Sequence, residues 1–221
     1  LTLSIRKGER IGIRGASGAG KTTLFNLLLG LYEPTGGEIT IDGTPLTAAN
    51  RRAWQNRIGY VSQNLFIADG SFAANVALGI PAGEVDRERV MQALRAAQLG
   101  ELVTGLAKGI DTHVGECGCR PSGGQRQRIG IARALIVEPE FIIADEPISA
   151  LDMSIRAQVL NLLRHLQKER GITYLFIAHD LSVMRYISDR IAVIHKGDIV
   201  ELADAEELVT HAIHPLSLIH I

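Results

Sequence analysis

Short apolar runs alternate along this chain with longer segments in which apolar residues recur every three or four positions. The runs Phe141–Ala144 and Ile172–Ala178 are continuous, as in parallel strands that are buried on both faces. The segments Thr23–Leu31 and Ile155–Leu166 have the spacing of amphipathic helices. This alternation predicts an α/β fold with a mostly parallel sheet and helices on both of its faces.

The expected elements can be given in chain order. Strands are expected over residues 1–14 around a Lys7-Gly8-Glu9 turn, then over 38–42, 57–61, 141–144 and 172–178, with a hairpin over 191–202. Helices are expected over about 20–31, 86–99, 124–137 and 152–170. The first helix should bury Leu24, Leu27, Leu28 and Leu31, and Asp152 should cap the last one. The apolar face of the helix over 86–99 should be Val90, Leu94 and Ala97.

A helical, loop-rich stretch over about residues 64–123 interrupts the α/β pattern. We therefore expect one domain over 1–215, with its core in about 1–63 and 124–215 and an inserted α-helical subdomain between them. Residues 216–221 break the preceding polar helical pattern and resemble a translated sequencing adaptor, so we expect a non-native tail. Because the first residue already lies in a strand-like pattern, we also expect the chain to be a fragment.

The segment Gly15-Ala16-Ser17-Gly18-Ala19-Gly20-Lys21-Thr22 lies between a predicted strand and a predicted helix. Glycines at this spacing allow a loop whose N–H groups point inward at phosphate oxygens, next to a helix N-terminus. Lys21 supplies a mobile positive charge for the β- and γ-phosphates, and Thr22 a hydroxyl for Mg²⁺. This phosphate loop predicts binding of a nucleoside triphosphate.

Composition narrows the alternatives. The 221 residues carry a net charge of −1, which provides no electrostatic basis for binding nucleic acid. No apolar run approaches the roughly 20 residues of a membrane-spanning helix, so we expect no direct membrane insertion. Two cysteines are too few for a disulfide framework, and a cytoplasmic location is expected.

Two further clusters have chemistry that suits the phosphate loop. Asp145 and Glu146 follow a predicted buried strand, and ligands of α/β sheets bind beyond the carboxyl ends of strands. Asp145 can therefore hold Mg²⁺ and Glu146 can polarise an attacking water. The segment Ser122–Gln125 leads into a helix and forms a second candidate anion-binding surface.

Together these segments resemble the nucleotide-binding domain of ATP-binding cassette (ABC) transporters, over almost the whole chain. The resemblance identifies the fold as that of a P-loop NTPase, with a RecA-like core, an antiparallel β subdomain and the inserted helical subdomain. The matching motifs are Walker A (15–22), the Q-loop (Gln63), the signature (122–125), Walker B with the catalytic glutamate (141–146), the D-loop (149–152) and the switch histidine (His179).

The resemblance implies a head-to-tail dimer with a second nucleotide-binding domain, of the same or another chain, and transmembrane partners. Each ATP would lie between Walker A of one copy and the signature of the other. Glu146, His179 and Gln63 would be catalytic, and Thr22, Gln63 and Asp145 would serve Mg²⁺. The implied ATP-binding residues are Gly15, Ser17, Gly18, Ala19, Gly20, Lys21, Thr22, Thr23, Ser122, Gly123, Gly124, Gln125 and Asp152. The domain would lie on the cytoplasmic face of the membrane.

The chain departs from the family pattern in several places. Pro121 replaces the usual leucine before the signature, which we expect to weaken its coupling, and Cys117 stands where exporter-type relatives often have arginine. No aromatic residue for stacking on adenine precedes Gly15. Residues 55–136 resemble exporter-type cassettes, and 138–215 resemble oligopeptide and dipeptide importer ATPases, which suggests a chimera joined within 124–139.

Two alternatives to a transport ATPase stay open. One is a soluble ABC-type ATPase of DNA repair or translation, although such relatives usually have long coiled-coil insertions or paired cassettes, and this chain has neither. The other is a truncated or chimeric reading frame that folds without a cellular role.

Overall fold

A six-stranded sheet forms the centre of the computed structural model, which describes residues 1–115, 118–149 and 151–210. Its strand order is β10-β9-β1-β8-β7-β4, and only β10 runs antiparallel to its neighbour. The strands are β1 (Arg10–Arg14), β4 (Ile58–Val61), β7 (Phe141–Asp145), β8 (Thr173–Ile177), β9 (Arg190–His195) and β10 (Asp198–Asp204). The expected mostly parallel α/β architecture is confirmed.

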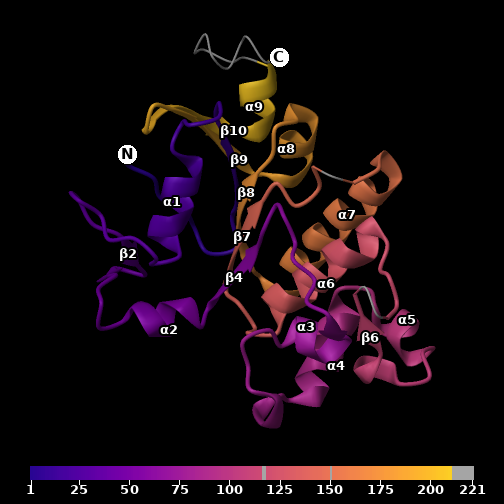
Figure 1. Ribbon diagram of the computed structural model, residues 1–221. Helices are drawn as coiled ribbons and strands as arrows, with labels where there is room; N and C mark the ends of the chain where they lie inside the picture. Colours follow the sequence, from indigo (N-terminus) through magenta and orange to yellow (C-terminus); the bar gives the residue numbers. More distant parts are fainter. Residues whose placement is uncertain (116–117, 150, 211–221) are drawn as a thin grey trace.

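Helices cover both faces of the sheet because its central strands are apolar on both sides (Figure 1). On one face, Ile143 and Leu175 pack with the buried Phe25 of α1 (Lys21–Leu28). On the other face, Ile142 and Phe176 belong to a larger cluster with the helices α4 (Arg87–Ala96), α6 (Gly123–Leu135) and α7 (Met153–Arg170). Adjacent residues of one strand thus serve opposite cores, as strand geometry requires.

The N-terminal segment does not form the expected strand. Only Arg10–Arg14 is extended in the sheet, whereas Leu3 and Ile5 lie against the α1 side of the core without strand pairing. Both neighbours of β1 are already occupied by β8 and β9, so within the described part of the chain no free strand edge lies beside it.

Helix α1 is shorter than predicted and buries a different residue. It ends at Leu28, because the chain turns at Gly30, whose φ is 67°. Leu31 therefore leaves the helix and is 60% exposed, while Phe25 takes the central core position at 2% exposure. The expectation that Leu31 is buried was wrong.

The segment between β4 and α6 contains mostly short helices. It forms α3 (Phe72–Val76), η1 (Ala82–Glu84), α4, α5 (Gly100–Thr104) and η2 (Gly109–Asp111), with the two-stranded pair β5 (Gly70–Ser71) and β6 (His113–Val114). Val90, Leu94 and Ala97, the predicted apolar face of α4, are all buried. The subdomain limits at 63 and 124 stay predictions.

The remaining elements are peripheral. A small antiparallel pair, β2 (Thr40–Ile41) and β3 (Thr44–Pro45), precedes α2 (Arg51–Gln55), and α8 (Leu181–Ile187) and α9 (Ala205–Thr210) follow β8 and β10. Among the described residues, no helix has the length and apolar character needed to cross a membrane. Residues 211–215, at the end of the predicted domain, and the predicted tail 216–221 lie outside the described residues, as does Cys117.

Candidate nucleotide site

Four neighbouring strands bring the predicted site residues to one edge of the sheet. The order β4-β7-β8-β1 places the carboxyl ends of these parallel strands side by side. Gln63 follows β4, Glu146 follows β7, His179 follows β8 and the phosphate loop follows β1. Residues that are more than 100 positions apart in sequence thereby share one edge, which is where ligands of such sheets bind.

The phosphate loop is constrained by its glycines. A side chain at Gly15 would place its Cβ 2.5 Å from the Ile194 carbonyl oxygen, so only glycine fits between the loop and β9. Gly18 and Gly20 have φ values of 77° and 104°, in the left-handed region that favours glycine. Gly20 is the N-cap of α1, so the loop leads directly into that helix N-terminus.

Lys21 is already oriented within this loop. Its Nζ donates to the carbonyl oxygens of Gly15 at 2.7 Å and Ala16 at 2.9 Å. An ammonium group has three donors, so one remains for a ligand in the loop. The arrangement fits the predicted role of Lys21 as a charge for phosphate oxygens.

The turn between β9 and β10 is hydrogen-bonded to the phosphate loop, which the spacing of the motifs could not predict. Gly197, in the turn between β9 and β10, donates its N–H to the carbonyl oxygen of the buried Ala19 at 2.9 Å. The sequence predicts this hairpin, but its contact with the phosphate loop depends on β9 lying next to β1 in the sheet.

The three predicted catalytic side chains meet at Glu146. Gln63 Nε2 donates to Glu146 Oε2 at 2.7 Å, and His179 Nε2 lies 2.5 Å from Glu146 Oε1. The Glu146 side chain is only 11% exposed, whereas that of His179 is 67% exposed. The carboxylate is thus held between a side-chain amide and an imidazole.

The backbone of Glu146 adopts an uncommon conformation, with φ at 44°. Its N–H donates to the Ile177 carbonyl oxygen at 3.2 Å, and its own carbonyl oxygen accepts from the N–H and the hydroxyl of Ser149. A left-handed glutamate costs roughly 1–3 kcal/mol and persists where the surroundings fix it, most often at functional sites. In this conformation the side chain of Glu146, just after β7, contacts Gln63 and His179.

Asp145 accepts a hydrogen bond from a residue that the motif comparison did not select. Tyr60 Oη donates to Asp145 Oδ2 at 3.4 Å. Burial raises the pKa of Asp145 above its usual value, and the adjacent charge of Glu146 acts in the same direction. Burial and the charge of Asp145 raise the pKa of the Tyr60 hydroxyl as well. The sequence signal that could have identified Tyr60 as a site residue is its position on the strand that leads to the Q-loop residue Gln63.

The donor atoms in this region suit Mg²⁺. Thr22 offers an exposed hydroxyl, Gln63 an amide oxygen and Asp145 a carboxylate, whose pKa is raised first by burial and then by the charge of Glu146. Mg²⁺ prefers oxygen ligands and usually keeps waters, bound by one or two carboxylates and substrate phosphates. Among the described residues no cluster of three or more His, Cys, Asp or Glu could hold a metal ion.

The predicted signature, Ser122–Gln125, forms a well-capped helix start. Ser122 Oγ accepts from the N–H of Gln125, and Gln125 Oε1 accepts from the N–H of Ser122, which is a complete capping box. Ser122 itself is exposed, whereas Gly124 is buried against Ile155 of α7.

The structure does not bring this segment to the phosphate loop. Its helix, α6, lies on the opposite face of the sheet from α1 (Figure 1). Within the described residues, no hydrogen bond or ion pair joins 122–125 to 15–22. Asp152, on the same side as the signature, occupies the N-cap position of α7, but its side chain accepts no capping hydrogen bond, so the expected cap is not formed. Arg156 donates to the carbonyl oxygens of Leu151 and Ser149 in the turn before this helix.

Pro121→Leu is expected to change the rate of ATP hydrolysis by less than about twofold, because Pro121 precedes the N-cap and removes no helical hydrogen bond. Phosphate release from Mg-ATP by both forms, at equal protein concentration, measures this. A rise of severalfold would instead show that proline impairs the signature, as sequence comparison suggests.

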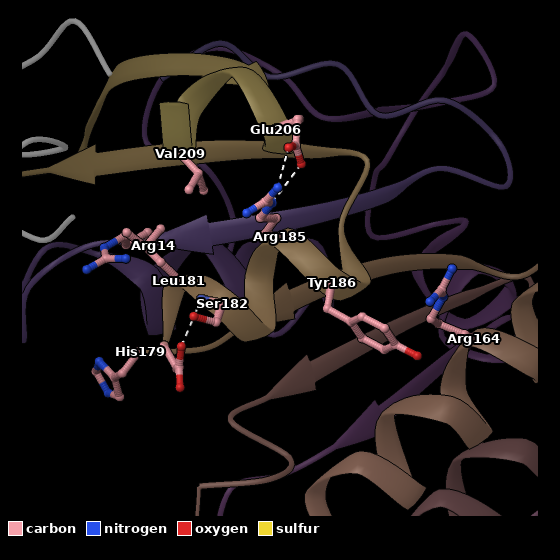
Figure 2. A pocket seen from close by; sticks show the side chains of 10 residues that line it. Arg14, Arg164, His179, Leu181, Ser182, Arg185, Tyr186, Glu206 and Val209 are labelled. Carbon is pink, nitrogen blue, oxygen red and sulfur yellow. Dashed lines mark hydrogen bonds and ion pairs between the residues drawn. The ribbon is translucent and has the colours of Figure 1, made fainter. Parts of the chain in front are cut away.

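Behind His179 lies a hollow of about 760 Å³ between β1, α7, α8 and α9. Figure 2 shows His179 and Arg14 at one end of it, with the Arg185–Glu206 ion pair behind them and Tyr186 beside Arg164 at the other end. His179 is therefore one of the residues that line this hollow.

Comparison with known proteins identifies the family of this chain. The profile of the family described as "ABC transporter" matches residues 1–149. The chain is 44% identical, over 96% of its length and 70% of the relative's, to an oligopeptide transport ATP-binding protein of Streptococcus pyogenes serotype M1. It is also 44% identical to a dipeptide transport ATP-binding protein of Lactococcus lactis subsp. cremoris, over 97% of the chain and 70% of the relative.

A solved structure is similar over the whole chain. It is the structure of a bacterial Atm1-family ABC exporter with ATP bound, at a TM-score of 0.84 and 31% identity, and the chain spans 37% of the exporter's length. Similarity to the oligopeptide transport ATP-binding protein and similarity to the exporter thus each extend through nearly all of the chain, and the predicted join between two halves stays a prediction.

Proposed function

We propose, from the premise that this chain belongs to the ABC transporter family, that it hydrolyses Mg-ATP at an interface between two nucleotide-binding domains. Its relatives over 96% of the chain are named transport ATP-binding proteins, and the chain is accordingly an ATP-binding and ATP-hydrolysing transport subunit. Three points go beyond this family membership and are proposals. They are the identity of the residues that hydrolyse ATP, the participation of Mg²⁺, and the sharing of each ATP site between two nucleotide-binding domains.

The separation of Ser122–Gln125 from the phosphate loop is the observation that supports a shared site. Both are anion-binding surfaces at helix N-termini, yet α1 and α6 lie on opposite faces of one sheet. A single copy leaves the γ-phosphate facing solvent beside Lys21. A second copy in head-to-tail orientation can cover it with its own Ser122 and neighbouring N–H groups.

Within this arrangement, Mg²⁺ would neutralise phosphate charge, held by Thr22 and Asp145 with Gln63 nearby. Glu146 accepts the proton of the attacking water as general base. Its partners Gln63 and His179 occupy both carboxylate oxygens before ATP binds, at 2.7 and 2.5 Å. Each carboxylate oxygen can accept a second hydrogen bond, so the attacking water can bind Glu146 beside these two partners.

The chain would act on the cytoplasmic face of a membrane, bound to transmembrane subunits. The names of its relatives favour peptides as the cargo of the whole assembly, since the two described above are named oligopeptide and dipeptide transport ATP-binding proteins. A soluble ATPase unrelated to transport is less favoured, because these relatives match nearly the whole chain.

Mixing two inactive variants tests the shared site. Lys21→Ala damages the phosphate loop, and Gly123→Asp places a negative charge in the signature. A Cβ at Gly123 would lie 3.6 Å from Leu151, an ordinary contact, and an aspartate in the first turn favours the helix, so the fold should be kept. Each variant alone should be inactive.

In the mixture, random pairing makes half of the dimers mixed, each with one intact site, so up to about a quarter of the wild-type rate should return. Phosphate release from Mg-ATP is measured for each variant and for the equimolar mixture. A mixture no more active than its components would exclude the head-to-tail site. Mixing Lys21→Ala with itself at doubled concentration is the control.

A further inference from the structure

We propose that Tyr60 is a positioning residue for Asp145, and that its hydroxyl orients this carboxylate for Mg²⁺. The inference rests on the proposed function, because it assigns a role within the same site. Tyr60 belongs to none of the motifs that identify the family, and it contacts Asp145 from the neighbouring strand.

Strand register places the two side chains on one face. In the parallel pair β4–β7, Tyr60 lies opposite Ile143, two residues before Asp145. Side chains two apart on a strand point to the same face, and Ile143 belongs to the core on the α1 side. Tyr60 and Asp145 therefore both face the side of the sheet that carries Lys21 and Thr22.

Asp145 depends on this contact for its orientation. Within the described residues, the hydroxyl of Tyr60 is the one side-chain donor that hydrogen-bonds to Asp145, whose carboxylate is partly buried beside Glu146. The hydrogen bond from Tyr60 is made to Oδ2, not to Oδ1. The distance of 3.4 Å between the two oxygens is long for a hydroxyl donor. We therefore expect the effect of this bond on Mg²⁺ affinity to be small for a residue that orients a metal ligand.

A purely structural role explains Tyr60 poorly. Along β4 the burial pattern is buried, buried, exposed, buried, and Tyr60 is the exposed position, at 41%. The ring does not fill the core, and a phenylalanine would keep whatever apolar contacts it makes. What tyrosine adds here is the hydroxyl beside Asp145.

Tyr60→Phe separates the two roles. Isothermal titration with a non-hydrolysable ATP analogue gives its Kd in EDTA and in saturating Mg²⁺, and the ratio of the two is the gain that Mg²⁺ provides. Partners that orient metal ligands typically contribute tenfold or more to metal affinity, so the ratio should fall about tenfold. The Kd in EDTA should stay within about twofold, because the variant leaves the phosphate loop intact.

Tyr186→Phe is a matched control. Tyr186 is 43% exposed and its hydroxyl also donates to a side chain, that of Asn161, but it lies on α8 on the other face of the sheet. Its removal should change neither Kd. Thermal unfolding of all three forms checks that they are folded.

Two results would overturn the inference alone: an unchanged ratio in Tyr60→Phe, or an equal loss of affinity in EDTA and in Mg²⁺, which would make Tyr60 a support of the loop. A wild-type chain that binds the analogue in neither condition would overturn the proposed function and this inference with it. A wild-type chain that binds equally in both conditions would remove the role of Mg²⁺, and again the inference with it.

Discussion

Replacing Lys21 by alanine is expected to remove tight ATP binding. The ammonium group lies within the loop, 2.7 and 2.9 Å from two of its carbonyl oxygens, with one donor left for phosphate. A hydrogen bond to a charged group contributes about 1.5–3 kcal/mol, so the loss of the one bond that the remaining donor makes to phosphate should weaken ATP binding by roughly ten- to 150-fold.

The Kd for ATP in Mg²⁺, measured by isothermal titration, checks this expectation. Lys7→Ala is the matched control, because it removes the same charge from an exposed residue that pairs with Glu140 at the opposite edge of the sheet. Its Kd should equal that of the wild type. If Lys21→Ala binds ATP as well as the Lys7 variant does, the loop is not the phosphate site.

Glu146→Gln is expected to abolish hydrolysis while ATP binding is retained. Glutamine keeps the shape of the side chain between Gln63 and His179, but an amide cannot accept the proton of the attacking water. A general base typically contributes about 10²–10⁴-fold to the rate, which sets the expected loss. Because the bound nucleotide then persists, the two-domain complex that it joins should persist as well.

Size-exclusion chromatography in Mg-ATP measures this directly. The Glu146→Gln chain should elute as a dimer in Mg-ATP and as a monomer in EDTA without nucleotide. Combining it with Lys21→Ala should return the monomer in both conditions, since ATP no longer binds. If the Glu146→Gln chain remains a monomer in saturating Mg-ATP, the proposed interface does not form.

Local patterns were sufficient for the class of fold and for most of the elements. Continuous apolar runs marked β7 and β8 within one residue at each end, since strands buried on both faces admit few polar residues. The apolar face of α4 was likewise correct. The phosphate loop could be located because its glycines, lysine and threonine are required by local backbone geometry and charge.

Errors arose where a local pattern depended on a partner elsewhere. Residues 1–9 have a strand-like pattern, yet only 10–14 enter the sheet, because β8 and β9 already flank β1. Leu31 continues the helical period but follows the left-handed Gly30, which turns it to solvent. Asp152 has the right identity and position for a cap, but its side chain accepts no capping hydrogen bond, because capping also depends on the side-chain orientation, which residue identity does not determine.

The amino-acid order alone predicted a phosphate loop, a catalytic glutamate and a second anion-binding segment. The tertiary structure decided how they relate. The order of the strands brought Gln63 and His179 into contact with the two carboxylate oxygens of Glu146. It also brought Tyr60 next to Asp145, and the β9–β10 turn next to the phosphate loop. It also placed α6 across the sheet from α1. Such pairings depend on which strands become neighbours, and that choice is set by packing of the whole core rather than by any single segment.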